Sequence, residues 1–225
     1  MSTIKAIIWD VDGVFVDTEE VHWQSWQRLF KELGYDLSME VYTPLVGHPG
    51  PQNMAALCDY FGVQSNQADL IKRRHAIFKE LCASGIPVIE NNAELARAFH
   101  REFPHILHSA ASSSQSHFVR ENLTNADVVH LMRVITSTDD RDDIKRKPAP
   151  DLYLSAIDKL GIDPDAIIAF EDSNAGVASA TSAGLRCIAL PNALTSDHDF
   201  SLASFIIANG AERTPSEIIG RSELA

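Results

Sequence analysis

The hydrophobic positions of the chain follow two rhythms, one typical of buried strands and one typical of helices. An almost unbroken apolar run leads from Ile4 to Trp9, which suits a strand buried on both faces of a parallel sheet. From Thr18 the pattern is helical for about seventy residues. From about Asn92 helices and strands alternate, as in a doubly wound sheet. The pattern therefore predicts an α/β fold with a doubly wound, mostly parallel sheet and an inserted all-helical domain.

This hydrophobic pattern determines the expected domain boundaries. We expect residues 1–17 and 92–225 to form the α/β core, and residues 18–91 to form the helical insert. In the first half of the chain, helices are expected at about residues 18–33, 38–45, 52–61, 66–83 and 93–103. The later strands are expected at about residues 105–111, 128–136, 166–170, 185–190 and 204–208.

Two carboxylates follow the first strand. Asp10 and Asp12 are two residues apart, so an extended path sends both side chains to the same side. Gly13 then lets the chain turn and approach a ligand. Converging carboxylates need a cation, a proton or a positive side chain, and Mg²⁺ prefers such oxygen ligands. The alternative is a turn that only ends the strand, because Asp and Gly are common turn residues.

Composition and charge limit the classes of partner. The 225 residues are 45% hydrophobic and 22% charged, which fits an ordinary globular protein of one domain with a smaller insert. The net charge of −12 argues against a nucleic acid or an anionic membrane as partner. The three cysteines are widely spaced, which makes a disulfide framework or a thiolate zinc site unexpected. With no secretory pattern at its start, the protein is expected to be cytoplasmic. A monomer is the simpler expectation.

Three later segments also deliver polar groups at expected strand ends. Ser112 and Ser113 open a helix after a strand, where free backbone N–H groups favour an anion, although plain helix capping explains one serine equally well. Lys147 precedes two prolines that fix the path of the chain. Glu171 and Asp172 follow a buried strand and so repeat the arrangement of the first one.

Taken together and in this order, the four motifs resemble those of the haloacid dehalogenase-like phosphohydrolases. The helical insert directly after the first motif is similar to the small cap of the β-phosphoglucomutase-like branch. The resemblance covers essentially the whole chain. It implies a Rossmann-like core with a helical cap, Mg²⁺ as cofactor and a phosphomonoester as substrate.

The resemblance also implies a role for each core residue. Asp10 would attack phosphorus and form an aspartyl phosphate, while Asp12 would act as proton donor and then as proton acceptor. Ser112, Ser113 and neighbouring N–H groups would hold the phosphoryl oxygens, and Lys147 would bridge the nucleophile and the phosphate.

The same resemblance implies the metal ligands. Mg²⁺ would be held by the Asp10 carboxylate, the Asp12 main-chain carbonyl and Asp172, with Glu171 in or next to its shell. Metal and lysine together would neutralise the charge on the transferring group, which lets one anion attack another.

Four residues of the insert are candidates for substrate contact. His22 and Trp26 match positions that the mutase uses beside its hinge, and Arg74 falls near the mutase's cap lysine. His22 could equally be the polar rim of a packing face, and the charged head of Arg74 is expected to reach the edge of its helix face. His48 lies in the segment Gly47-His48-Pro49-Gly50, which stands where the branch usually has an arginine.

Without that arginine a second phosphate group would be poorly held, so hydrolysis of a small sugar or polyol phosphate is expected, with sugar phosphomutase activity as the alternative. Asp12 speaks against a dehalogenase, and Lys72, beside two arginines, is a poor lysine for a phosphonatase. A non-catalytic phosphate-binding protein would have no reason to keep every acid and the lysine.

Overall fold

A computed structural model describes residues 3–46, 48–83, 85–208 and 210–222. Gly47, part of the segment that replaces the arginine of the branch, lies outside these residues. The chain divides into two compact units, one of Met1–Asp17 with Val88–Ala225 and one of Thr18–Pro87. The chain returns to the larger unit at Val88, before the boundary expected between residues 91 and 92. Val88 already pairs with Val16 of that unit, and helix α5 begins at Glu90.

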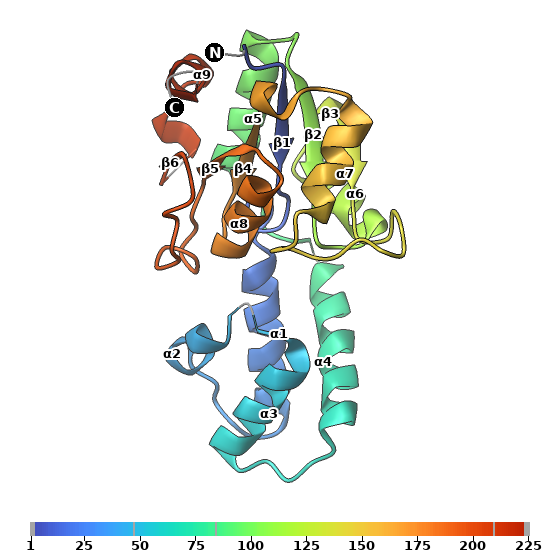
Figure 1. The fold of residues 1–225 in the computed structure, drawn as a ribbon. Helices are drawn as coiled ribbons and strands as arrows, with labels where there is room; N and C mark the ends of the chain where they lie inside the picture. The colour runs from blue at the N-terminus through green and yellow to red at the C-terminus, as the bar shows by residue number, and fades with distance from the viewer. Residues whose placement is uncertain (1–2, 47, 84, 209, 223–225) are drawn as a thin grey trace. The chain divides into compact units, whose positions relative to one another are not determined.

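The larger unit is built on a six-stranded sheet in which every paired strand is parallel, in the order β3-β2-β1-β4-β5-β6 (Figure 1). The strands are β1 (Ala6–Trp9), β2 (Leu107–Ala111), β3 (Met132–Thr136), β4 (Ile167–Glu171), β5 (Arg186–Ala189) and β6 (Phe205–Ile206). The helices are α5 (Glu90–Glu102), α6 (Ser116–Asn125), α7 (Asp151–Leu160), α8 (Asn174–Ser182) and α9 (Pro215–Ser222). The doubly wound prediction is confirmed.

Several predicted bounds are too wide. The predicted strand 128–136 divides into a 3-10 turn, Val129–Leu131, and β3. The strand predicted from residue 105 begins at Leu107, because Ile106 N–H still donates to the Phe103 carbonyl in a turn. Of the last strand, predicted at 204–208, only Phe205–Ile206 is a regular strand beside β5, although the N–H groups of Ser204 and Ile207 also donate to carbonyls of β5. Hydrophobicity marks a buried segment, whereas only pairing with a neighbour makes it a strand.

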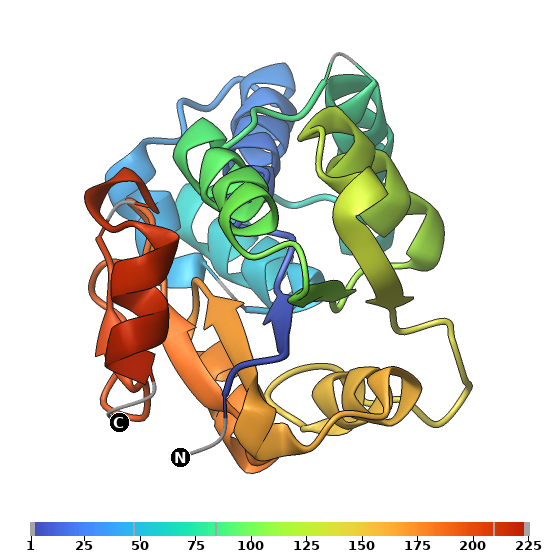
Figure 2. The ribbon, with the colours of Figure 1, turned by 90° about the horizontal axis from the view of Figure 1, so that it is seen from above.

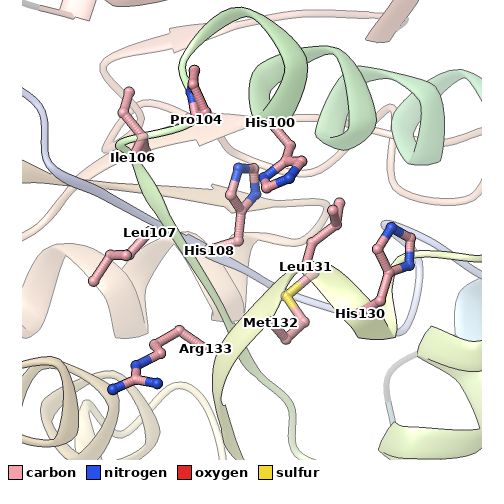
Figure 3. Close-up of a pocket in the computed structure, with 9 residues that line it drawn as sticks. All are labelled: His100, Pro104, Ile106, Leu107, His108, His130, Leu131, Met132 and Arg133. Carbon is pink, nitrogen blue, oxygen red and sulfur yellow. The ribbon is translucent and has the colours of Figure 1, made fainter.

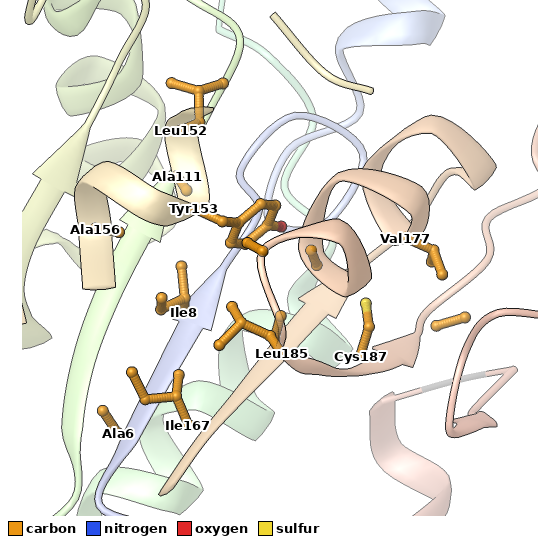
Figure 4. Packing of buried hydrophobic residues seen from close by; sticks show 14 of the residues in the cluster. Ala6, Ile8, Ala111, Leu152, Tyr153, Ala156, Ile167, Val177, Leu185 and Cys187 are labelled. Atoms are coloured by element: carbon orange, nitrogen blue, oxygen red, sulfur yellow. The ribbon is translucent and has the colours of Figure 1, made fainter. Parts of the chain in front are cut away.

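Helices cover both faces of this sheet. Alternate residues of β1 point to opposite faces, so Ala6 and Ile8 enter the apolar cluster that includes Tyr153 of α7 (Figure 4). Trp9 points the other way, where it stacks on Phe170 at 4.2 Å between ring centroids. Figure 2 shows α5 and α7 on opposite sides of β1. Burial on both faces explains why the β1 sequence is apolar throughout.

The smaller unit is all-helical. Its helices are α1 (Thr18–Glu32), α2 (Met39–Tyr42), α3 (Gly50–Phe61) and α4 (Gln67–Cys82), with a 3-10 turn at Thr43–Leu45. Helix α1 has acidic residues in its first turn and Lys31 in its last turn. These charges stabilise the helix by interacting favourably with its dipole. The hydrophobic core of the smaller unit includes Trp26, Phe30, Leu57 and Ile77. Among the described residues of both units, no helix is long and apolar enough to cross a membrane.

Candidate active site

The candidate site lies at the carboxyl ends of β1 and β4, next to each other at the centre of the sheet. The chain runs outward from β1 through β2 to β3 and then returns to β4, so the strand order reverses between β1 and β4. In open α/β sheets ligands bind at such a switch point. Asp10 N–H donates to the Phe170 carbonyl at 2.9 Å, which extends the pairing by one residue. The acids that follow β1 and those that end β4 are thereby brought together.

Lys147 joins these two groups of acids. Its ammonium group contacts the Asp10 carboxylate, and it lies 2.6 Å from Glu171 Oε1 and 2.8 Å from the Ala111 carbonyl at the end of β2. The Lys147–Pro148 peptide bond is cis, and the Lys147 N–H donates to Ser113 Oγ at 3.3 Å. Residues far apart in the sequence therefore fix the lysine at both its backbone and its tip.

The charges in this site act strongly on one another because the side chains of Asp10, Lys147 and Glu171 are almost completely buried. Burial raises the pKa of Asp10 well above its usual range; the charges of Glu171, Asp172 and Asp12 add to this rise, and Lys147 opposes it. Burial alone would lower the pKa of Lys147, but the charges of Asp10 and Glu171 outweigh burial and raise it. The lysine is therefore held in its charged form by an excess of negative charge.

The same acids offer a place for a cation. One carboxylate oxygen from each of Asp10, Glu171 and Asp172 lies within 4.8 Å of the others, and all three residues are buried. Asp10 Oδ2 and Glu171 Oε2 are buried without a hydrogen-bond partner among the described residues. Buried, unpaired carboxylate oxygens are costly unless a cation or a proton satisfies them. The donor set of hard oxygens fits Mg²⁺.

Asp12 is held apart from this cluster by neutral donors. Its Oδ2 accepts hydrogen bonds from the hydroxyls of Ser112 and Ser114, each at 2.8 Å. Its Oδ1 accepts one from the Asn122 amide at 3.1 Å. The carboxylate is thus oriented without a salt bridge to the lysine, so the two aspartates of the first motif have different surroundings. Different surroundings are what two acids need for different chemical tasks.

Three of the partners were not predicted from the sequence. Asn192 Nδ2 donates to Asp172 Oδ2 at 2.9 Å, and the Tyr153 hydroxyl donates to Glu171 Oε1 at 2.7 Å. Asn192 could have been found, because it follows β5 and so lies at the same edge of the sheet. Tyr153 and Asn122 lie within helices, and nothing in their local sequence points to the site.

Gly176, in the first turn of α8, gives room to the Glu171 carboxylate. A Cβ atom at position 176 would lie 1.8 Å from Glu171 Oε2. We expect Gly176→Ala to displace Glu171 from Lys147 and to lower the rate of turnover at least about tenfold. Measured kcat/KM and the dependence of turnover on Mg²⁺ concentration test this prediction.

Gly220→Ala is the matched control, since Gly220 also lies in a helix and a Cβ atom there would meet nothing within 4 Å. Equal activity of the two variants would contradict the role of the close approach between Gly176 and Glu171.

The predicted cap residues lie in the smaller unit. His48 is exposed, and Trp26 is buried in the core of that unit. The expectation that the head of Arg74 reaches the edge of its helix face is wrong, because Arg74 is only 7% exposed. Its guanidinium donates to Ser25 Oγ at 2.9 Å and lies 4.8 Å from the centre of the Trp26 ring. An aromatic wall and a hydroxyl hold the arginine inside.

His22 completes this group. Its ring stacks on Phe78 with centroids 4.3 Å apart, and its Nδ1 contacts the Arg74 guanidinium. Because arginine can only donate, Nδ1 must be the acceptor and the ring must be neutral. Burial, together with the charge of Arg74, lowers the pKa of His22 to about 3. The hydrogen-bond partners of Arg74 are thus neutral; burial lowers the pKa of its guanidinium, and the charge of Glu19 opposes this fall.

Comparison with known proteins identifies the relatives of this chain. A family model described as haloacid dehalogenase-like hydrolase matches residues 7–190. The CbbY protein of Rhodobacter capsulatus is 34% identical over 91% of this chain and 92% of its own length. A phosphorylated carbohydrates phosphatase of Thermotoga maritima is 26% identical over 82% of this chain and 84% of its own.

A solved structure extends the likeness to the fold. A mutant CbbY from Rhodobacter sphaeroides in complex with xylulose-(1,5)bisphosphate superposes with a TM-score of 0.68 and 26% identity, covering 93% of this chain and 96% of that one. The range that the family model matches spans the strand-end acids and Lys147. The chain therefore belongs to the haloacid dehalogenase-like hydrolase family, as a phosphoric monoester hydrolase.

Proposed function

We propose that this protein hydrolyses a small sugar or polyol phosphate, with Mg²⁺ as cofactor, through an aspartyl phosphate formed on Asp10. The observation that carries the proposal is the placement of Asp10. It lies between a lysine held in its charged form and two further acids, at the switch point of the sheet. Phosphatase relatives support a phosphomonoester as substrate.

In the first step an oxygen of the Asp10 carboxylate attacks phosphorus, and the bond from phosphorus to the sugar oxygen breaks. Lys147 offsets the negative charges of the nucleophile and of the incoming phosphate, so that two anions can meet. The hydrogen bond of its ammonium group to the Ala111 carbonyl fixes the position of this charge. The lysine therefore acts by position and charge, and it transfers no proton.

Asp12 moves the proton in both steps. It donates a proton to the leaving sugar oxygen, and it then takes one from the water molecule that releases phosphate from Asp10. Two hydroxyls occupy Oδ2, whereas a single amide contacts Oδ1. We therefore assign the transferred proton to Oδ1. The hydroxyl of Ser112 orients Asp12, and donors around Ser112 and Ser113 remain our proposal for holding the phosphate.

Asp10, Glu171 and Asp172 are the side chains that would hold Mg²⁺, with the Asp12 carbonyl as a further ligand implied by the family. When bound, the ion would neutralise charge on the transferring phosphate. Asn192 keeps Asp172 oriented toward this place, and Tyr153 does the same for Glu171.

Hydrolysis is favoured over mutase activity by the charges of the smaller unit. A mutase must hold a bisphosphate, which requires a strong second anion site. The exposed arginines there are paired: Arg28 with Glu80 at 2.8 Å and Arg73 with Glu32 at 2.7 Å. Arg74 hydrogen-bonds to the neutral Ser25 and His22 instead, and the charge of Glu19 also acts on it, so we infer that it offers at most one positive charge to a substrate. One such group suits a small polar substrate with a single phosphate.

A screen of phosphate esters tests the proposal. The purified protein would be incubated with Mg²⁺ and fructose 1-phosphate, glycerol 3-phosphate, xylulose 1,5-bisphosphate or β-glucose 1-phosphate, with free phosphate as the readout. We expect release from at least one ester and none when EDTA removes the metal. Glucose 6-phosphate formed without free phosphate, in the presence of a trace of the bisphosphate, would show a mutase. No turnover of any ester, nor of an aryl phosphate, would show a binding protein.

Replacing Arg74 tests its contact with substrate. We expect Arg74→Met to raise KM about tenfold or more with a smaller change in kcat, because a binding charge is lost and the chemistry is not. Arg73→Met is the matched control, since Arg73 is the next residue on α4 and is exposed. Thermal unfolding of both variants would check that the smaller unit stays folded. Equal KM values for the two folded variants would rule out this role of Arg74.

A further inference from the structure

Asn122 is a polar residue on the buried face of helix α6. The structure buries Val119, Asn122 and Leu123 of this helix, and Asn122 is only 5% exposed. A buried amide is costly unless it forms hydrogen bonds. Asn122 Nδ2 donates to Asp12 Oδ1 at 3.1 Å, although the two residues lie far apart in the sequence. The hydrogen bond to Asp12 therefore accounts for an amide between two apolar side chains.

Asn122 differs from the two serines that also donate to Asp12. Ser112 and Ser114 lie between β2 and α6, where we place the phosphate. The Ser112 hydroxyl has a single hydrogen, which it gives to Asp12 Oδ2 in this structure. It cannot donate to a phosphoryl oxygen without giving up Asp12. Asn122 lies inside a helix and away from solvent, so it can hold Asp12 throughout the reaction.

The hydrogen bond from Asn122 becomes stronger as Asp12 gives up its proton. In the first step the proton moves from Asp12 Oδ1 to the leaving oxygen, which takes the electron pair of the breaking phosphorus–oxygen bond. An N–H group binds a carboxylate more strongly than a neutral carboxyl group. Asn122 therefore stabilises Asp12 more after the transfer than before it. This difference lowers the barrier for an ester whose leaving oxygen needs a proton.

Histidine is the usual proton donor in enzymes, and three histidines of the larger unit lie together. His100, His108 and His130 line a cavity of about 340 Å³ (Figure 3). The cavity lies at the amino ends of β2 and β3, which begin with Leu107 and Met132. The candidate active site uses the carboxyl ends of the strands. These three imidazoles therefore do not compete with Asp12 as proton donor.

We propose that Asn122 is a positioning residue of the phosphatase reaction. Its amide holds Asp12 Oδ1 toward the leaving oxygen and so makes the hydrolysis of esters with poor leaving groups efficient. The inference rests on the proposed function, because it takes Asp12 as the proton donor. Asn122 acts through Asp12 alone, since its burial keeps it away from the substrate.

Two aryl esters of similar shape test the proposal. Phenolate is a poor leaving group that needs a proton, whereas 4-nitrophenolate leaves without one. Single-turnover release of phenol from phenyl phosphate, and of 4-nitrophenol from 4-nitrophenyl phosphate, measures the first step alone, with Mg²⁺ present and protein in excess. We expect Asn122→Leu to lower the rate for phenyl phosphate about tenfold and the rate for 4-nitrophenyl phosphate less than about twofold. A merely structural role would lower both rates equally.

Asn125→Leu is the matched control, because Asn125 is an exposed asparagine of the same helix, and we expect it to leave both rates unchanged. Thermal unfolding checks that each variant is folded. Should Asn122→Leu fail to fold, Asn122→Ala removes the same amide without adding bulk. Equal losses for the two esters, or no loss for either, in a folded Asn122 variant would overturn the proposal.

Asp12→Asn separates this proposal from the proposed function. We expect this variant to lower the rate for phenyl phosphate at least about 100-fold, with a far smaller effect on 4-nitrophenyl phosphate. If Asp12→Asn shows this selectivity and the folded Asn122 variants do not, only the role of Asn122 is wrong. If Asp12→Asn lacks the selectivity, Asp12 is not the proton donor, and both the proposed function of Asp12 and the role of Asn122 are wrong.

Discussion

Turnover of every phosphate ester is expected to disappear when Asp10 is replaced by asparagine, with a loss of at least about 10⁴-fold. Asparagine fills the same volume, but its amide is too weak a nucleophile to attack phosphorus and it removes one negative charge from the acidic cluster. The fold should stay intact, because the backbone pairing of Asp10 with Phe170 does not involve the side chain. Phosphate release and thermal unfolding measure the two effects.

The control for this substitution is Asp158→Asn on helix α7. Asp158 is exposed, and its carboxylate is not part of the acidic cluster, so full activity is expected. A further readout uses the covalent step: wild-type protein should take up label from a phosphorylated substrate in an acid-stable but base-labile form, and the Asp10→Asn variant should not. Retained turnover in the variant would mean that another group is the nucleophile.

Replacing Lys147 by methionine should harm both activity and stability. Within the part of the chain that the structure describes, the Lys147 ammonium group is the only positive charge in contact with Asp10 and Glu171, whose side chains are 7% and 1% exposed. Removing one partner from a buried ion pair costs roughly 3–5 kcal/mol, because the remaining charges stay buried without compensation. We expect a loss of this size in the free energy of unfolding without metal, and a fall in kcat of about 10³-fold or more.

The effect of Mg²⁺ on stability gives a second test of the role of Lys147. A divalent cation bound by the acidic cluster would replace part of the missing charge, so adding Mg²⁺ should stabilise Lys147→Met more than it stabilises the wild-type protein. Denaturant unfolding with and without Mg²⁺ measures the difference. Lys159→Met is the control, because Lys159 pairs with Asp140 at the surface, where such pairs contribute little. An unchanged unfolding free energy for Lys147→Met would contradict the electrostatic account of the site.

Much of the site could be predicted because a parallel sheet imposes a simple rule. The carboxyl ends of all its strands meet at one edge, so a polar group that follows a buried apolar run is carried to that edge. Asp10 and Glu171 could be grouped in this way once helices and strands were seen to alternate, whereas Lys147 comes well after β3 ends at Thr136 and is brought to the same edge by its loop. The same rule would have found Asn192 after β5.

What the sequence determined by itself was the kind and order of the elements, because hydrophobic periodicity is a local property of the chain. Tertiary structure alone decided which side chains meet across long separations. Tyr153 reaches Glu171 and Asn122 reaches Asp12 from helices whose local pattern is ordinary. Arg74 is buried because Trp26 and Ser25 of another helix receive it, and a charge on an apolar helix face cannot reveal such partners. Burial and pairing depend on the neighbours, and a single segment carries no record of them.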